Sequence, residues 1–180
     1  MKKITAIVLA ALMLFTLAAC GGNNATNGNA APAVYEGTLS SLCTKMYETN
    51  PVELMVMTEG ADIDLSDPAN LEYYLGITNT ADIKEAIFSE TMMGSQAYSL
   101  VLVRVNDTAK VEEIKKSILE NVNTRKWICV EANQIRVASS ADLIMFIMLD
   151  SSFGETIADG MVEAFKTNVG ELTGETLSKG

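Results

Sequence analysis

Apolar residues spaced three or four positions apart predict three amphipathic helices in this chain. The first covers residues 38–49, with Thr38 or Ser40 available as its cap. The second follows residue 107 and extends to residue 122, and the third begins near residue 152 at a capping-box sequence. A shorter helix is predicted to begin at Asp67-Pro68 and to end at Gly76, because these residue types favour helix starts and ends.

Apolar runs between these helices predict strands. Residues 100–105 and 143–149 are apolar on both faces, so a sheet built from them needs cover on both sides. Residues 127–130 and 134–138 are predicted as one further extended segment, with Ser139-Ser140 as the turn, and residues 52–58 are short and compatible with a strand. Residues 82–93 fit both a helix and a strand. We favour a strand, because the strand at 97–105 needs a partner and Gly94-Ser95 is typical of a hairpin turn.

The order strand-strand-helix therefore occurs twice and predicts an α+β fold. Aligning Leu100 with Ile144 gives an offset of roughly 44 residues, which suggests an internally duplicated unit. We expect a four-stranded, mainly antiparallel sheet with two helices packed on one face, preceded by the N-terminal helix. The other face is then covered by residues 38–76, which we favour, or by a partner protein.

The first twenty residues predict a secreted, lipid-anchored protein. Two lysines precede an apolar run that is too short to span a bilayer comfortably, as in a secretory signal. The run ends in Leu17-Ala18-Ala19-Cys20, which resembles the bacterial lipobox. This resemblance implies cleavage between Ala19 and Cys20 and a diacylglyceryl group on Cys20. Two acyl chains make a stable anchor, so the protein is expected on the extracytoplasmic face of the bacterial membrane.

These features divide the chain into four parts. Residues 1–19 are the predicted signal peptide, and residues 20–36 are a lipidated flexible tether rich in Gly, Asn and Ala. Residues 37–168 are expected to form a single α+β domain, because their number suits one ordinary core. Residues 169–180 are predicted as a flexible tail.

Charge and composition exclude several classes of function. The chain has 13 basic and 23 acidic residues, and loss of two signal lysines leaves 11 − 23 = −12. An acidic body of this size argues against nucleic-acid binding. The absence of histidine excludes histidine-dependent triads and His-ligated zinc, and the sequence contains no standard nucleotide-binding glycine motif. No cofactor is predicted.

Two cysteines besides Cys20 leave an open question. Cys43 and Cys129 are expected in a compartment where disulfides persist, so they could pair. Both also stand among apolar residues, where free cysteine behaves as a small buried apolar residue, and we favour this second interpretation.

One candidate ligand site is Arg125-Lys126-Trp127, where two cations adjoin the only tryptophan. Such a cluster could bind a carboxylate, a phosphate or an anionic wall polymer. The alternative, which we favour, is a helix end with cations suited to the dipole and a tryptophan packed in the core.

The sequence favours neither a calcium site nor a copper site. The acidic stretch 59–67 lacks the glycine and glutamate positions of an EF-hand, so a solvated loop with a helix cap is preferred to calcium binding. The methionines could bind copper(I), but without a clustered array they are expected to fill the core.

Part of the chain resembles a known family. From Tyr74-Leu75-Gly76-Ile77 through AYSLVLVRV, VEEIKKSILENV and the later strand pair, residues 71–166 resemble the DUF4358 family of small bacterial lipoproteins. The chain departs from the family pattern at residues 125–129. Since the family's function is unknown, the resemblance implies only a fold and a location.

The combined prediction is a membrane-anchored, non-enzymatic module that binds another component of the cell envelope. A lipoprotein that binds a small solute or cation is the alternative, although one domain cannot close around a ligand as two lobes do. A hydrolase that uses paired carboxylates ranks third, since no such pair stands out among the acidic residues.

Overall fold

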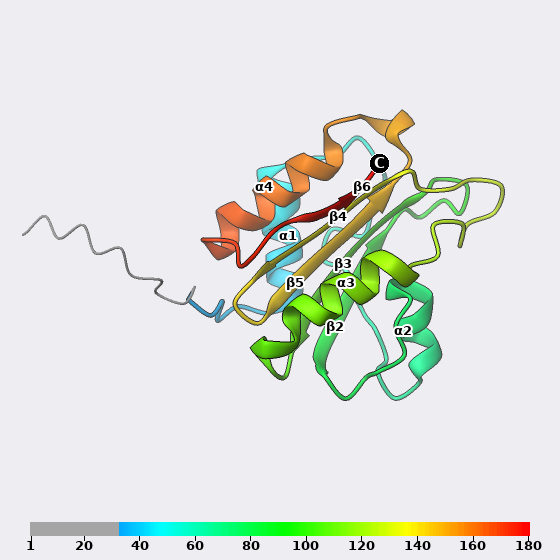
Figure 1. The fold of residues 1–180 in the computed structure, drawn as a ribbon. Helices are drawn as coiled ribbons and strands as arrows, with labels where there is room; N and C mark the ends of the chain where they lie inside the picture. The colour runs from blue at the N-terminus through cyan, green and yellow to red at the C-terminus, as the bar shows by residue number, and fades with distance from the viewer. Residues whose placement is uncertain (1–32) are drawn as a thin grey trace, which may run out of the picture. The chain divides into compact units, whose positions relative to one another are not determined.

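The computed structural model describes residues 33–180, which form an α+β domain with a six-stranded antiparallel sheet and four α-helices (Figure 1). The elements are α1 (Leu39–Thr49), β1 (Ala61–Asp62), α2 (Pro68–Leu75), β2 (Ile83–Glu90), β3 (Tyr98–Val105), α3 (Val111–Asn121), β4 (Gln134–Ser140), β5 (Leu143–Leu149), α4 (Ile157–Val169) and β6 (Leu177–Lys179). The predicted signal peptide, the lipobox with Ala19 and Cys20, and most of the tether lie outside the described residues. Within the described part, no helix is long and apolar enough to cross a membrane.

The sheet contains the four predicted strands and two short ones at its edges. Its order is β1-β2-β3-β5-β4-β6, so the central pair is β3 and β5. Strand β2 confirms the choice of a strand for residues 82–93. The prediction of four strands was wrong, because it missed the two edge strands β1 and β6. These are only two and three residues long and carry no periodic signal.

Both faces of the sheet are covered by a pair of helices. Helices α1 and α4 pack on the face that carries Leu100, Met145 and Ile147. Helices α2 and α3 pack on the opposite face, against Val101 and Phe146. Figure 1 shows the two pairs on either side of the sheet. The expectation that the two later helices share one face was therefore wrong, and residues 38–76 contribute one helix to each face.

This placement also contradicts the 44-residue alignment. Strands β3 and β5 are antiparallel neighbours, so a duplication would relate them by a two-fold axis normal to the sheet, which keeps equivalent residues on one face. Leu100 faces α1 and α4, whereas Ile144 faces α2 and α3. The chain repeats the order strand-strand-helix without the symmetry that the alignment predicts.

Several helix ends agree with the sequence prediction. Thr38 caps α1 by accepting a hydrogen bond from the Ser41 amide at 3.1 Å. Asp67 caps α2, and Gly76 ends it in the left-handed conformation with φ 69°. The backbone of Asn121 lies so close to Gly76 that a Cβ there would clash, which adds a second reason for glycine.

Other boundaries differ. Residues 127–130 form an irregular loop instead of a strand, and β4 continues through Ser139 and Ser140, so the turn falls at Ala141 with φ 50°. Helix α4 begins at Ile157, beyond the predicted capping box, because Asp150 caps a separate short turn over Ser151–Phe153.

The C-terminal segment, predicted as a flexible tail, is built into the domain. Strand β6 pairs with β4 from Ile135 to Val137. Before it, the Ser139 hydroxyl donates to the Thr173 carbonyl at 2.7 Å, and the Thr173 hydroxyl accepts from the Ala141 amide at 3.0 Å. The Lys115 ammonium is fully buried beneath this segment and donates to the Glu175 carbonyl at 2.7 Å.

Candidate functional site

The predicted site residues lie on the irregular loop between α3 and β4, and the structure separates their roles. Arg125 is exposed and forms an ion pair with Glu131 at 3.1 Å. Lys126 points inward and its side chain is only 1% exposed. Trp127 is partly buried and packs against the core on the α2 and α3 face. The expected helix end was wrong, because α3 ends at Asn121 and both cations lie beyond it, whereas the packing of Trp127 agrees with the favoured interpretation.

The Lys126 ammonium lies inside a group of three aromatic rings and one carboxylate, which we call the Lys126 cage (Tyr73, Tyr74, Trp127 and Glu90). Its Nζ lies 4.8 Å from the ring centroids of Tyr73 and Tyr74, and 5.3 Å from that of Trp127. The Glu90 carboxylate forms an ion pair with the Lys126 ammonium at 2.5 Å. Cations are attracted to the faces of aromatic rings, so the cage surrounds the ammonium with favourable partners.

Three elements hold the cage in place. Tyr73 and Tyr74 come from the last turn of α2, which places both rings over the end of β2. The Tyr74 ring stacks on Phe88 of β2, with 4.2 Å between centroids. Glu90 is the last residue of β2, and Ser99 of β3 accepts a further hydrogen bond from Lys126 at 3.2 Å. The cage therefore joins α2, the first hairpin and the loop that follows α3.

Burial and charge act in opposite directions in the cage. Burial lowers the pKa of Lys126, while the neighbouring Glu90 carboxylate opposes this shift. The pKa of Tyr74 rises to about 12, because burial and the negative charge of Glu90 both disfavour a phenolate. The pKa of Tyr73 is raised for the same two reasons. The net shift of the Lys126 pKa is downward, so the Glu90 carboxylate offsets only part of the cost of burying the ammonium, and the two tyrosines stay protonated beside it.

Most of the exposed large apolar side chains lie at the same end of the sheet as the cage. We call it the loop end, and the last residue pairs of the long strands mark it, which are Glu90 with Ser99, Tyr98 with Leu149 and Gln134 with Leu149. Met92 and Met55 are adjacent there, because the Met92 amide donates to the Met55 carbonyl at 3.0 Å. The exposed fractions are Ile128 78%, Met92 71%, Met55 66%, Met93 54% and Tyr73 47%.

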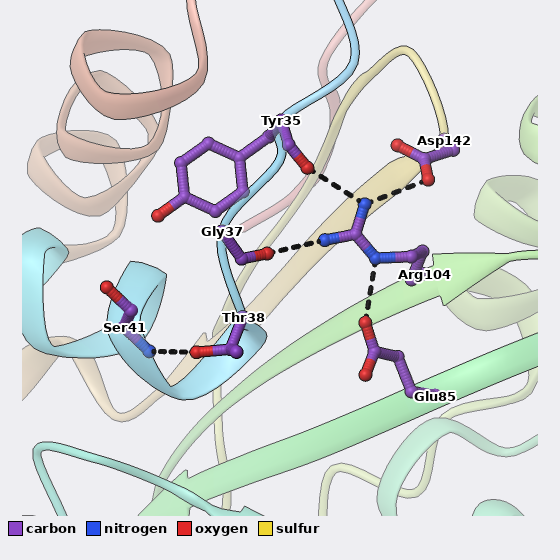
Figure 2. Close-up of polar contacts among 7 residues, drawn as sticks. All are labelled: Tyr35, Gly37, Thr38, Ser41, Glu85, Arg104 and Asp142. Carbon is purple, nitrogen blue, oxygen red and sulfur yellow. Dashed lines mark hydrogen bonds and ion pairs between the residues drawn. The ribbon is translucent and has the colours of Figure 1, made fainter.

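At the opposite end of the sheet, Arg104 binds the segment that leads into α1 (Figure 2). Its guanidinium donates to Glu85 at 2.7 Å, to Asp142 at 2.9 Å, and to the backbone carbonyls of Tyr35 and Gly37 at 3.1 and 2.9 Å. We call this group the Arg104 clasp. The Arg104 side chain is only 7% exposed, so the clasp is an ion-pair network around a buried guanidinium.

The neighbouring carboxylates keep the guanidinium of Arg104 ionised. Burial alone would lower the pKa of Arg104, but the hydrogen bonds and charges of Glu85 and Asp142 outweigh burial and raise it. A hollow of about 290 Å³ adjoins the clasp between Tyr35, Lys84 and Asp142. Sequence reasoning missed this cluster, although a lone arginine in the apolar run 97–105 was the signal that could have revealed it.

The cysteines are not bridged. Cys43 is buried in the core as expected, whereas the expectation of a buried Cys129 was wrong, because Cys129 lies exposed on the loop between α3 and β4. Burial raises the pKa of the Cys43 thiol to about 12. Beside it, the Tyr47 hydroxyl shares hydrogen bonds with Ser89 at 2.7 Å and Tyr98 at 3.0 Å, which satisfies the polar atoms of this core.

The acidic stretch serves as local structure. Asp64 accepts a hydrogen bond from the Ser66 amide at 2.9 Å, and bonds with Ser66 lower the pKa of Asp64. Asp67 caps α2. Within residues 33–180, no three His, Cys, Asp or Glu side chains are grouped so as to hold a metal ion. The expectation that the methionines fill the core holds for Met46, Met145, Met148 and Met161 and was wrong for Met55, Met92 and Met93, which are exposed.

Comparison of the sequence and fold with protein-family models, curated proteins and solved structures found no match.

Proposed function

We propose that this protein is a non-enzymatic lipoprotein, anchored through Cys20 on the extracytoplasmic face of the bacterial membrane, that binds another envelope protein through its loop end. The lipobox sequence at residues 17–20 supports the location. The resemblance of residues 71–166 to the DUF4358 family is part of the same proposal.

The observation that carries the binding proposal is the gathering of exposed apolar side chains at the loop end. Methionine is flexible and polarisable, and it is common on surfaces that adapt to protein partners. Met55, Met92 and Met93 stand on two adjacent segments, and Ile128 extends from the neighbouring loop. Grouped exposed apolar residues favour an interaction surface over a solvated one.

The position of the loop end also fits an anchored protein. The Arg104 clasp holds the chain at Tyr35 and Gly37, at the other end of the sheet. Figure 1 shows residues 33–38 and the loops at opposite ends of the strands. A tether attached at one end leaves the apolar loops of the other end free to meet a partner.

Site-specific photocrosslinking in intact cells tests this proposal. A photoreactive amino acid replaces Met92 in one chain and exposed Lys116 on α3 in a matched control. We expect one envelope protein to crosslink from position 92 and not from position 116, and to be lost when Cys20→Ala removes the anchor. Equal crosslinking from both positions, or none from position 92, would overturn the loop end as the binding surface.

The anchor has its own test, which does not depend on a partner. Metabolic labelling with a palmitate analogue is expected to mark the wild-type chain and not the Cys20→Ala variant. An unlabelled wild-type chain would contradict the lipoprotein proposal and leave the crosslinking result to be judged separately.

A further inference from the structure

We propose that the Lys126 cage is a binding site for organic cations of the alkylammonium class, in which Lys126 acts as a built-in competitor that an incoming cation displaces. This inference goes beyond the proposed function and depends neither on the lipid anchor nor on a protein partner.

The composition of the cage supports the cation class. Three aromatic rings within 4.8 to 5.3 Å of one ammonium, together with one carboxylate, form the arrangement that proteins use to recognise alkylated ammonium groups. A wholly structural lysine needs only a counter-ion such as Glu90. The three rings add an attraction that any other ammonium group of similar size would share.

The position of the cage makes it reachable. Tyr73 forms one wall and is 47% exposed, so only one ring separates the ammonium from solvent there. Tyr73 also lines a hollow of about 310 Å³, together with Glu72 and Asn123. An arriving cation can therefore meet the ring and the negative charge of α2 before it reaches the ammonium of Lys126.

The element that carries Lys126 is suited to release it. Lys126 belongs to the irregular loop between α3 and β4, whereas four of the five groups around its ammonium belong to α2, β2 and β3. Ile128 and Cys129 of this loop are exposed, but Trp127 packs against the core, so we place the movement in the Lys126 side chain and not in the whole loop. The aromatic walls can stay in place while the lysine leaves.

Charge in the rest of the molecule favours the exchange. The chain is strongly acidic overall, with 23 acidic and 13 basic residues, so cations concentrate near its surface. Within the cage, displacement of one ammonium by another keeps Glu90 paired and leaves no buried charge without a partner.

Trp127 provides the measurement, because it is the only tryptophan of the chain and lines the cage. The full-length protein is purified in a maltoside detergent, which carries no ammonium group, and titrated with tetramethylammonium at constant ionic strength. Tryptophan fluorescence and calorimetry follow binding. The neutral analogue 2,2-dimethylpropan-1-ol, of similar shape, is the matched control for charge.

We expect weak, saturable binding to the wild type and at least tenfold tighter binding to Lys126→Ala, since the internal competitor is gone. Adding Tyr73→Ala or Glu90→Gln to that variant is expected to weaken binding at least threefold, and the neutral analogue should not bind. Lack of saturable binding by a folded Lys126→Ala protein would overturn the proposal.

A second measurement uses the wild type and does not depend on how the variants fold. Acetylation of lysines with a soluble ester is followed by mass spectrometry, with exposed Lys116 as the internal reference. Tetramethylammonium is expected to raise the relative acetylation rate of buried Lys126 at least threefold. If the ratio of Lys126 to Lys116 acetylation rates does not change at saturating tetramethylammonium, the cation does not displace the lysine, and the proposal fails.

Discussion

Arg104 places a permanent charge inside a strand whose other side chains are all buried. Replacing it with methionine keeps much of its volume but leaves Asp142 and two backbone carbonyls without their donor. Removing one partner of a buried ion pair costs about 3–5 kcal/mol. Because Glu85 is half exposed and can turn to water, we expect Arg104→Met to lower the free energy of unfolding by about 3 kcal/mol in urea denaturation.

Arg125→Met is the matched control for that substitution. Its ion pair with Glu131 is exposed on both sides, and such pairs contribute about 0–1 kcal/mol. A loss at Arg104 no larger than the loss at Arg125 would contradict the stabilising role of the Arg104 clasp.

The buried thiol of Cys43 makes the free energy of unfolding depend on pH in the alkaline range. Burial raises the pKa of its thiol from 9.0 to about 12, so the folded state keeps the proton where the unfolded state releases it. The stabilisation is fully present below pH 9 and is lost as the pH rises toward about 12. Relative to Cys43→Ala, the wild-type unfolding free energy should fall about 1.4 kcal/mol more per pH unit in this window.

Cys129→Ala is the control for this pH dependence, because the Cys129 thiol is exposed. Urea midpoints measured at several pH values between 8.5 and 11 give the three slopes. Parallel curves for the wild type and Cys43→Ala would mean that the buried thiol does not titrate with folding.

At this scale the sequence predicted which residues are unusual but not which way they face. Arg125 and Lys126 are adjacent, and only tertiary contacts with α2 and β2 decide that the second turns inward. The partners of Lys126 come from residues 73, 74, 90 and 99, which no local pattern connects to it.

Among the elements, those with long apolar patterns were predicted well and those fixed by single contacts were not. Strand β5 has the predicted bounds, and α1 and α2 begin and end at the expected caps. Strands β1 and β6 are too short for a period of two to be visible. The face chosen by each helix depends on loop lengths and packing, which periodicity alone does not encode.

The C-terminal segment supplies a test of an element that sequence reasoning took for a flexible tail. Ending the chain after residue 169 removes β6 and the Glu175 carbonyl, which exposes the edge of β4 and leaves Lys115 with one partner. We expect a loss of about 2–4 kcal/mol and aggregation on warming, because an unpaired edge recruits other strands. Thermal denaturation and light scattering measure both effects.

Ending the chain after residue 176 is the graded control. It removes β6 but keeps the contacts of Thr173 and Glu175. Its loss should be clearly smaller, and a truncation at 169 as stable as the full chain would restore the interpretation of a tail.

In the whole molecule, one sheet is shared by two apolar layers. Phe165 of α4 lies in one layer and Phe146 of β5 in the other, and both are fully buried. Each substitution by alanine is expected to cost about 3–5 kcal/mol. Because the four long strands β2, β3, β4 and β5 each contribute residues to both layers, the domain should unfold in one transition for each variant.

Trp127 fluorescence and far-ultraviolet circular dichroism give two independent views of that transition. Their midpoints are expected to coincide in the wild type and in both variants. A fluorescence midpoint well below the dichroism midpoint would indicate that the α2 and α3 layer opens first.

The Arg104 clasp has a mechanical consequence for a protein pulled by its leading segment. A force applied ahead of residue 35 reaches the carbonyls of Tyr35 and Gly37 before it reaches α1, and both are bonded to the same guanidinium. The load then passes into β3, a central strand held by seven paired positions on the β5 side, which resist together. Tension on the chain is thereby transferred to the centre of the sheet, and α1 carries less of the load.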